Sequence, residues 1–174
     1  MQGIQPAGCA RCRNRTYRTY GPTVSRPKTN GIANGGPFGD IKPSMRESHL
    51  TDIRPPFTDP RGQILNLLDL PIGSVSLITS VKGAVRANHY HKTDWHYCYM
   101  EKGSMDYYYR PVGAKKPAQY IRVEEGKMVY TPSMEEHAMV FTSDAVMWCF
   151  AGNPRTSKDY ESDTVRVPSI VPAV

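Results

Sequence analysis

Beyond about residue 50, short apolar runs alternate with turn-forming residues. The runs are rich in Val, Ile, Tyr, Thr and Phe, recur about every ten residues, and are separated by Gly, Pro, Asp, Ser or Lys. They lie at residues 64–70, 74–81, 96–100, 105–110, 119–123, 128–131, 137–141 and 146–151. This texture is typical of an antiparallel sandwich or barrel, and we predict an all-β fold. Because no segment keeps a helical period over three turns, we expect little helix.

Residues 1–50 have a different texture. They contain five prolines and seven glycines and form no apolar face, so they predict an irregular N-terminal arm. We therefore divide the chain into a basic, Gly/Pro-rich arm (1–50), a barrel (51–168) and a proline-bearing tail (169–174).

The charge is concentrated in the arm. Residues 1–50 carry eight Lys or Arg against Asp40 and Glu47, which gives a balance of +6, the formal charge of the whole chain. The barrel is neutral, so the basic pI does not bear on its ligand. Arginines interleaved with Tyr17 and Tyr20 would suit an acidic surface, but nucleic-acid binding is not favoured because no recognised module accompanies them.

The sequence gives no sign of membrane insertion or secretion. No run approaches the length of a membrane-spanning segment, and the N-terminus lacks an apolar signal core. We expect a cytoplasmic location, and disulfides are not expected there. Cys98 and Cys149 lie in apolar runs and are predicted to be buried thiols, whereas the Cys9–Cys12 pair lacks the second pair of a zinc ribbon.

Histidines cluster in the middle of the chain. His89, His91 and His96 fall within eight residues, and His137 follows later. Alternate residues of a strand share a face, so His89 and His91 point the same way, and His96 can return to the same cavity on the next strand. Neutral imidazoles gathered in one cavity are plausible ligands for a divalent metal.

Two stretches resemble the cupin motifs. Gly83-(x5)-His89-x-His91-(x4)-His96-(x6)-Gly103 is similar to the first motif, with His96 where the family usually has Glu. Gly126-(x5)-Pro132-x-Met134-(x2)-His137-(x3)-Phe141 resembles the second motif, with Met134 in place of its Gly and Phe141 in place of its Asn. The resemblance covers about residues 52–167 and implies a double-stranded β-helix, the cupin jelly-roll barrel.

The resemblance also implies a set of site residues. The metal-ligand positions are His89, His91, His96 and His137, and the implied cofactor is a divalent metal such as Zn, Fe, Mn or Ni. Without the usual carboxylate at position 96, the site loses a negative charge. The alternative is a metal-free pocket, as in the cupins that modify nucleotide sugars.

A second resemblance points to those sugar-nucleotide epimerases and ketoisomerases. Asp59-Pro60-Arg61-Gly62-Gln63-Ile64 is similar to their strand entry, and Arg86 precedes the paired histidines as in those enzymes. By this resemblance, His89 and His137 are the catalytic candidates, acting as base toward a proton next to a keto group. The candidates for substrate binding are Arg61, Arg86, Tyr107 and Tyr109.

Three functions stay open at this point. The first is a cupin isomerase or epimerase of a sugar or sugar nucleotide, with a pocket that binds metal. The second is a metal-dependent dioxygenase or lyase. The third is a non-enzymatic jelly-roll subunit of a shell or virion, with its arm lacing subunits together. The cupin resemblance also implies a homodimer or higher homo-oligomer.

Overall fold

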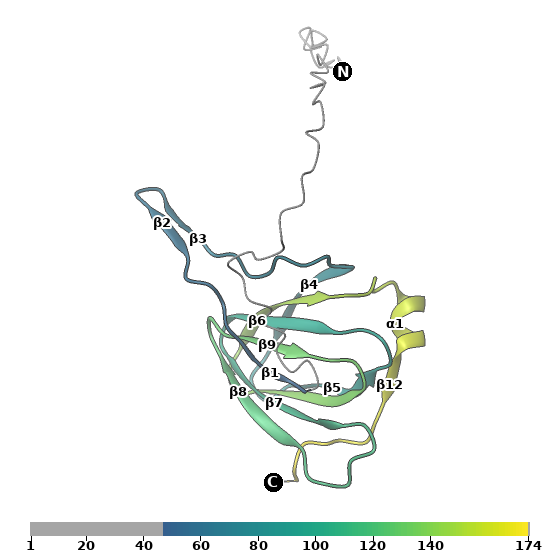
Figure 1. Cartoon of the computed structure of the whole chain (residues 1–174). Coiled ribbons are helices and arrows are strands. Elements are labelled where there is room, and N and C mark those ends of the chain that lie inside the picture. Colours follow the sequence, from purple (N-terminus) through teal and green to yellow (C-terminus); the bar gives the residue numbers. More distant parts are fainter. Residues whose placement is uncertain (1–46, 174) are drawn as a thin grey trace, which may run out of the picture. The chain divides into compact units, whose positions relative to one another are not determined.

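The computed structural model describes residues 47–173 (Figure 1). Most of the predicted arm, including Cys9 and Cys12, lies outside the described residues, as does the last residue of the tail. In chain order the elements are β1 (His49–Thr51), β2 (Phe57–Asp59), β3 (Gly62–Ile64), β4 (Ser74–Ser80), β5 (Val85–His91), β6 (His96–Lys102), β7 (Ser104–Pro111), β8 (Gln119–Glu124), β9 (Met128–Thr131), β10 (Glu135–Phe141), β11 (Ala145–Ala151), α1 (Ser157–Asp163) and β12 (Thr164–Arg166).

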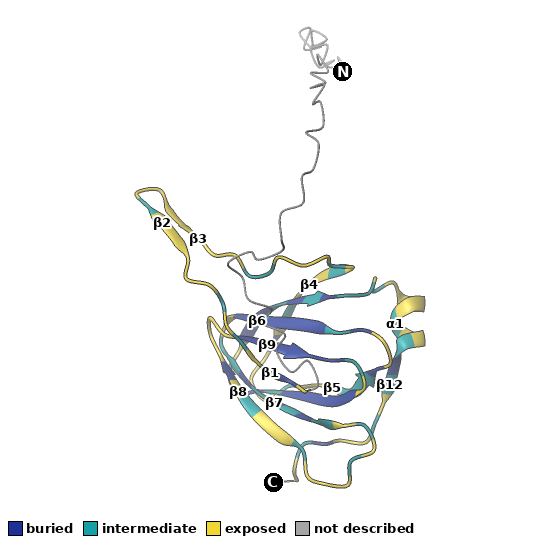
Figure 2. Cartoon of the chain, viewed as in Figure 1, coloured by how far each residue is buried: buried dark blue, intermediate teal, exposed yellow. Residues whose placement is uncertain are grey.

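The strands form two five-stranded antiparallel sheets. The first has the order β1-β9-β6-β11-β4, and the second has the order β12-β5-β10-β7-β8. Consecutive strands of the barrel therefore often lie in different sheets, as a jelly roll requires. The buried residues lie mainly along the central strands of both sheets (Figure 2). The prediction of an all-β antiparallel barrel is confirmed.

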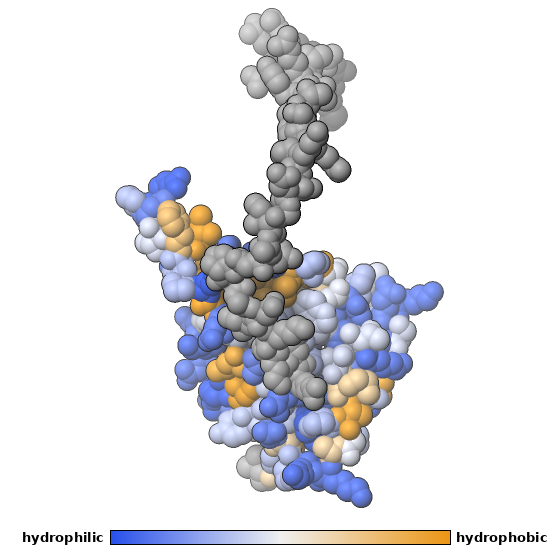
Figure 3. Space-filling model, in the orientation of Figure 1, coloured by the Kyte–Doolittle hydropathy of each residue, from blue (hydrophilic) through white to orange (hydrophobic). Residues whose placement is uncertain are grey.

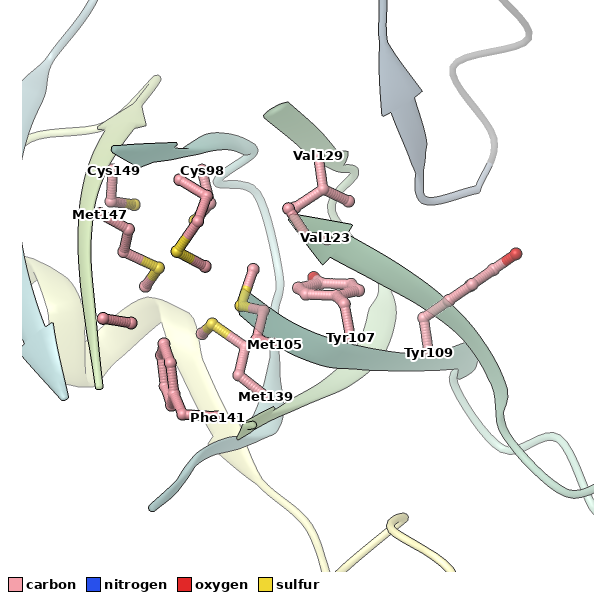
Figure 4. Packing of buried hydrophobic residues seen from close by; sticks show 12 residues of the cluster. Cys98, Met105, Tyr107, Tyr109, Val123, Val129, Met139, Phe141, Met147 and Cys149 are labelled. Carbon is pink, nitrogen blue, oxygen red and sulfur yellow. The ribbon is translucent and has the colours of Figure 1, made fainter. Parts of the chain in front are cut away.

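The core lies between the two sheets and is rich in methionine and aromatic side chains. Strand β7 shows why its sequence folds this way, because its burial alternates: Met105, Tyr107 and Tyr109 are buried, and Tyr108 between them is only half-buried. Cys98 and Cys149 are both buried in this core, as the sequence predicts (Figure 4). Other members include Val123, Val129, Met139, Phe141 and Met147.

The prediction of a strand over residues 64–70 is wrong. Ile64 ends β3, and residues 65–70 form no regular strand. Leu68 in this segment packs instead against the buried group Tyr97, Met128 and Tyr130, on the first sheet. The apolar run therefore covers a sheet rather than extending a ladder, and its composition cannot distinguish these two outcomes.

The short helix α1 is a feature that the hydrophobic pattern does not predict. The hydroxyl of Thr156 accepts a hydrogen bond from the Asp159 backbone N–H and donates one of 2.6 Å to the Asp159 carboxylate. This reciprocal arrangement caps the first turn. The helix has no buried residue, so no apolar period marks it in the sequence.

Strands β2 and β3 pair only with each other among the described strands. Their hairpin projects beyond the two sheets (Figure 1). Phe57 and Ile64 face each other in its register and are 61% and 62% exposed. Apolar surface, coloured orange, is visible on the hairpin in Figure 3. None of the helical structure in residues 47–173 is long and apolar enough to span a bilayer.

Candidate functional site

The two sheets bring the four predicted histidines around one cavity. His89 and His91 lie on β5, and His137 lies directly opposite His89 on β10 of the same sheet. His96 begins β6 in the other sheet, after the short turn that follows His91. Neighbouring imidazole rings are 4.7 Å apart for His89 and His137, and 5.1 Å apart for His96 and His137. Alternation along the strands therefore places these side chains as the sequence suggests.

Three of the four histidines form a tight group. One ring nitrogen from each of His89, His91 and His137 lies within 4.8 Å of the others. His96 does not join this group, and its Nδ1 lies 3.4 Å from Nη2 of Arg155. The residue at the position of the usual cupin carboxylate thus contacts a cation in this structure.

Hydrogen bonds fix the orientation of two rings. Nδ1 of His91 lies 3.2 Å from Oδ2 of Asp163, and Nδ1 of His137 lies 3.2 Å from the backbone carbonyl of Glu135. Both contacts favour a proton on Nδ1, which leaves the lone pair on Nε2. Nε2 of each ring is buried and has no partner among residues 47–173. Such orphaned acceptors suit a metal ion or a substrate proton.

The histidines are held in the neutral form. Burial lowers the pKa of His91, His96 and His137, and lowers that of His89 to about 4, with help from the charge of His91. Neutral imidazoles at neutral pH can accept a proton or bind a cation.

A group of residues around α1 completes the cavity and was missed by sequence reasoning. Asp94 is buried, accepts a 2.8 Å hydrogen bond from the backbone N–H of Asn153, and lies 3.3 Å from Nη2 of Arg155. The guanidinium of Arg155 lies 5.6 Å from the ring centre of Tyr160. Asp163 reaches His91 across 72 residues of sequence. Asp94 lies between His91 and His96 in the sequence, but no local pattern links Arg155, Tyr160 or Asp163 to the histidines.

A bulge in β5 shapes the cavity wall. His137 pairs with His89, but the next residue of β10, Ala138, pairs with Ala87, so Asn88 is an extra residue in the ladder. Ala87 and Asn88 have positive φ of 68° and 55°, a conformation that is costly for residues with a side chain. Arg86 stands an odd number of residues from His89 and His91, so in a regular strand it would point to the opposite face. The bulge shifts the alternation, and Arg86 therefore lines the same cavity.

The cavity itself is small, with a volume of about 150 Å³. It is lined by Ile78, Arg86, Ala87, His89, His91, His96, Cys98, His137, Met139, Met147, Cys149, Arg155 and Tyr160. The side chain of Arg86 also borders a larger groove of about 450 Å³, to which Lys102 contributes a second positive charge.

The predicted tyrosines do not line this cavity. Tyr107 is fully buried, its ring stacks on His137 at 5.9 Å, and its hydroxyl lies 2.5 Å from that of Thr131. The hydroxyl of Tyr109 extends away from the other labelled side chains in Figure 4. Tyr107 thus supports His137 by packing, and its hydroxyl already has a partner.

Arg61 also lies apart from the histidines. It sits in the turn of the β2–β3 hairpin, where its guanidinium forms a 2.6 Å ion pair with Asp59 and its side chain is 86% exposed. Within the described chain, the structure does not bring Arg61 to the cavity.

Glu135 and Glu136, at the start of β10, are both buried. The carboxylate of Glu135 accepts hydrogen bonds from the backbone N–H and hydroxyl of Ser48, and Glu136 forms a 2.6 Å ion pair with Arg110. Burial raises the pKa of Glu135 to about 7. Their partners supply the reason: Ser48 and Arg110 lie far away in sequence and cannot be read from the turn.

No protein-family model and no curated protein matches the sequence. Solved structures do match the fold. QdtA, a sugar 3,4-ketoisomerase from Thermoanaerobacterium thermosaccharolyticum in complex with TDP, aligns over 70% of this chain and 88% of its own, with 18% identity and a TM-score of 0.57. A 3,4-ketoisomerase from Helicobacter canadensis aligns over 68% of this chain and 90% of its own, with 17% identity and a TM-score of 0.58.

A third structure is a double mutant of ChmJ, a 3'-monoepimerase from Streptomyces bikiniensis, in complex with dTDP. It aligns over 66% of this chain and 68% of its own, with 15% identity and a TM-score of 0.54. At such identities the likeness establishes the fold. The chain therefore has the cupin jelly-roll fold that its histidine motifs imply.

Proposed function

We propose that this chain is an isomerase or epimerase that moves a proton next to the keto group of a sugar nucleotide. The observation that carries the proposal is the environment of His91. Its Nδ1 contacts the Asp163 carboxylate at 3.2 Å, and its Nε2 is buried without a partner in residues 47–173. A base held in this way can take a proton from carbon, and the carboxylate stabilises the imidazolium that results.

This proposal shifts the predicted base from His89 and His137 to His91. His89 has a pKa of about 4 and lacks a carboxylate hydrogen bond in the described chain. His137 is held by a neutral carbonyl, which stabilises an imidazolium less than a carboxylate does. His91, in contrast, is the member of the tight group whose ring is hydrogen-bonded to a carboxylate.

Arg155 is suited to stabilise the enolate that proton removal creates. Its side chain lines the cavity, and its Nε is buried without a partner among residues 47–173. A fixed cationic N–H donor at a developing negative oxygen lowers the barrier most in a site that excludes water.

The size of the cavity limits what it could hold. A volume of about 150 Å³ suits a sugar ring rather than a whole sugar nucleotide. The nucleotide would lie outside, where the groove lined by Arg86 and Lys102 offers two positive charges to phosphate groups against the one negative charge of Asp144.

A metal-dependent reaction is the second candidate, favoured by the ring nitrogens of His89, His91 and His137 within 4.8 Å of one another. The orphaned Nε2 atoms of His91 and His137 fit a metal, because the Nδ1 contacts leave them as acceptors. Zn, Fe, Mn or Ni bound there would polarise a substrate oxygen as a Lewis acid. A metal on His91 would occupy the nitrogen that the first candidate needs free.

Deuterium exchange separates these candidates. The purified protein is incubated in D₂O with 4-keto-6-deoxy sugar nucleotides, and proton NMR follows exchange at the carbons beside the keto group. We expect exchange by the wild type, a loss of about 100-fold or more in His91→Asn, and no loss in the control His49→Asn, which lies on β1. Folded protein inert toward the whole panel would reject the proposal.

Elemental analysis and chelation are run on the same samples. The first candidate predicts that exchange continues at the same rate after chelator treatment. A rate that falls with the metal content and returns when one metal is added back would instead establish the second candidate.

A further inference from the structure

We propose that Cys98 and Cys149 form a reversible dithiol–disulfide pair in the wall of the histidine cavity, oxidised by a hydroperoxide small enough to enter it. The proposal is independent of the proposed function, because neither thiol takes part in the proton transfer. It begins from the sheet register. Cys149 on β11 lies directly opposite Cys98 on β6, so both side chains leave the sheet on the same face.

The backbone geometry already suits a disulfide. Directly opposed residues of an antiparallel ladder have Cα atoms about 4.5–5.5 Å apart. A disulfide accepts Cα separations of about 4.4–6.8 Å. The Cα separation therefore permits a bond between Cys98 and Cys149, and forming it would draw their Cβ atoms together from roughly 4.5–5.5 Å to about 3.8 Å. Figure 4 shows the two residues on their neighbouring strands, with Met147 beside them.

The two cysteines also belong to one buried core cluster. Both residues are almost inaccessible from the outer surface, with exposures of 1% and 3%. Their approach to one another is therefore set by the core and does not depend on a mobile loop.

Access to the pair runs through the cavity. Both cysteines line the same space of about 150 Å³ as the four histidines. A water molecule takes up about 30 Å³, so hydrogen peroxide can occupy this space. A bulky alkylating reagent such as N-ethylmaleimide cannot reach the sulfurs from outside, since the core covers them.

The chemistry balances with hydrogen peroxide as the oxidant. One thiol sulfur attacks a peroxide oxygen, so that an S–O bond forms, the O–O bond breaks, and the thiol proton leaves with the other oxygen as water. The second sulfur then displaces the hydroxyl of the sulfenic acid, which forms the S–S bond and a second water. Neutral imidazoles in the cavity can carry the protons. The peroxide is reduced, the two thiols are oxidised, and an added dithiol reverses the change.

Peptide mapping of the full chain tests the proposal. The folded protein is exposed to hydrogen peroxide, denatured, alkylated with N-ethylmaleimide and digested with trypsin. Cleavage after Lys92, Lys102, Lys127 and Arg155 places Cys98 in peptide 93–102 and Cys149 in peptide 128–155, each as the sole cysteine. The expected product is a cross-linked pair of these two peptides, which dithiothreitol separates. This assignment also excludes Cys9 and Cys12 as the source.

Variants make the outcome decisive. Cys98→Ala and Cys149→Ala should lose the cross-link and instead gain oxygen on the remaining cysteine. Before oxidation, N-ethylmaleimide should label neither residue in the folded wild type and both after denaturation. Peptides that stay reduced, or that gain oxygen atoms without cross-linking in the wild type, would overturn the proposal. So would equal labelling of folded and denatured protein by N-ethylmaleimide.

Discussion

At the scale of single residues, the site depends on what holds each imidazole by its Nδ1. Asp163 holds His91, and the carbonyl of Glu135 holds His137, so that both Nε2 atoms are left as buried acceptors without a partner in residues 47–173. The carboxylate is itself fixed: Asp163 accepts hydrogen bonds of 2.8 and 2.7 Å from the backbone N–H and hydroxyl of Thr93. Thr93 therefore fixes Asp163, and Asp163 in turn orients the imidazole of His91.

Asp163→Asn tests this support. The amide keeps the shape of the side chain and loses its charge, so an imidazolium at His91 is less stable and proton transfer slows. We expect the exchange rate to fall about 10- to 100-fold and the acidic limb of its pH profile to move to lower pH. The control Glu161→Gln removes a charge from the same helix. If both variants behave alike in the pH profile, the specific role of Asp163 is wrong.

The backbone of Met134 is strained. It has a φ of 59° at the position where the second cupin motif has Gly, and its N–H donates a 2.7 Å hydrogen bond to the carbonyl of His91. This contact ties the β9–β10 turn to the end of β5. The side chain is half exposed, so little packing offsets the strain.

Replacing Met134 should therefore stabilise the fold if the new residue relieves the backbone. Met134→Gly is expected to raise the free energy of unfolding by about 1 kcal/mol and the melting temperature by about 2–4 °C. Met134→Ala keeps a Cβ at positive φ and should give no comparable gain. Equal stability of both variants in urea denaturation would show that the strain is not relieved at this residue.

At the scale of elements, α1 closes one end of the cavity. It carries Tyr160 and Asp163, but it has only seven residues and no buried side chain. Such a short helix is marginal alone. Its stability rests on the Thr156 cap and on the contacts of Asp163, so the cap should matter for the site as well as for the helix.

Thr156→Ala should fray the first turn of α1. Loss of an N-cap costs about 1 kcal/mol, and the looser helix should also place Asp163 less firmly, so that exchange slows while the fold persists. Lys158→Ala, an exposed change on the same helix, should affect neither property. Circular dichroism melts and the deuterium assay provide the two measurements. Slower exchange without lower stability would argue against the cap as the cause.

How far the sequence predicts the molecule follows from the range of each contact. Strand runs and paired histidines are local patterns with a period of two, and they predict the sheets and the direction of His89 and His91 well. Residues 64–70 fail because an apolar run can cover a sheet as well as join it. Asp163, Arg155 and Ser48 escape prediction because their partners lie 59 to 87 residues away, and only the folded topology brings them together.

At the scale of the whole molecule, buried titratable groups on both sheets make the stability of the fold depend on pH. The folded chain keeps its cavity histidines neutral, with His89 at a pKa of about 4 against an ordinary 6.5. The unfolded chain thus binds more protons between pH 4 and 6.5, and stability rises with pH across this window. Glu135 acts in the opposite sense. Its pKa of about 7 against 4.5 means that the folded chain binds more protons, so its contribution falls as pH rises from 4.5 to 7.

Chelator-treated protein should therefore be most stable near pH 6.5, because four histidines outweigh one glutamate below this pH and the glutamate loss continues above it. Glu135→Gln should remove the decline and gain up to about 3 kcal/mol at pH 8 relative to pH 5, compared with the wild type. Glu124→Gln, an exposed change on β8, should keep the wild-type profile. Urea denaturation from pH 5 to 8 checks both, and parallel profiles for wild type and Glu135→Gln would contradict the assignment.

The extra residue in β5 has a consequence for how this strand can tolerate changes in length. When a regular strand loses one residue, every side chain on one side of the deletion moves to the opposite face of the sheet. Here Asn88 is already surplus to the ladder, and its side-chain oxygen and carbonyl serve the C-terminal segment by accepting from the N–H groups of Ile170 and Val167. Deleting it would make the pairing regular while Arg86 stayed opposite Met139 and came to stand two positions from His89, so both halves of the strand would keep their present faces. Strand β5 can thus lose this one residue without reversing either half, and what the deletion removes is the pair of acceptors that hold the C-terminal segment.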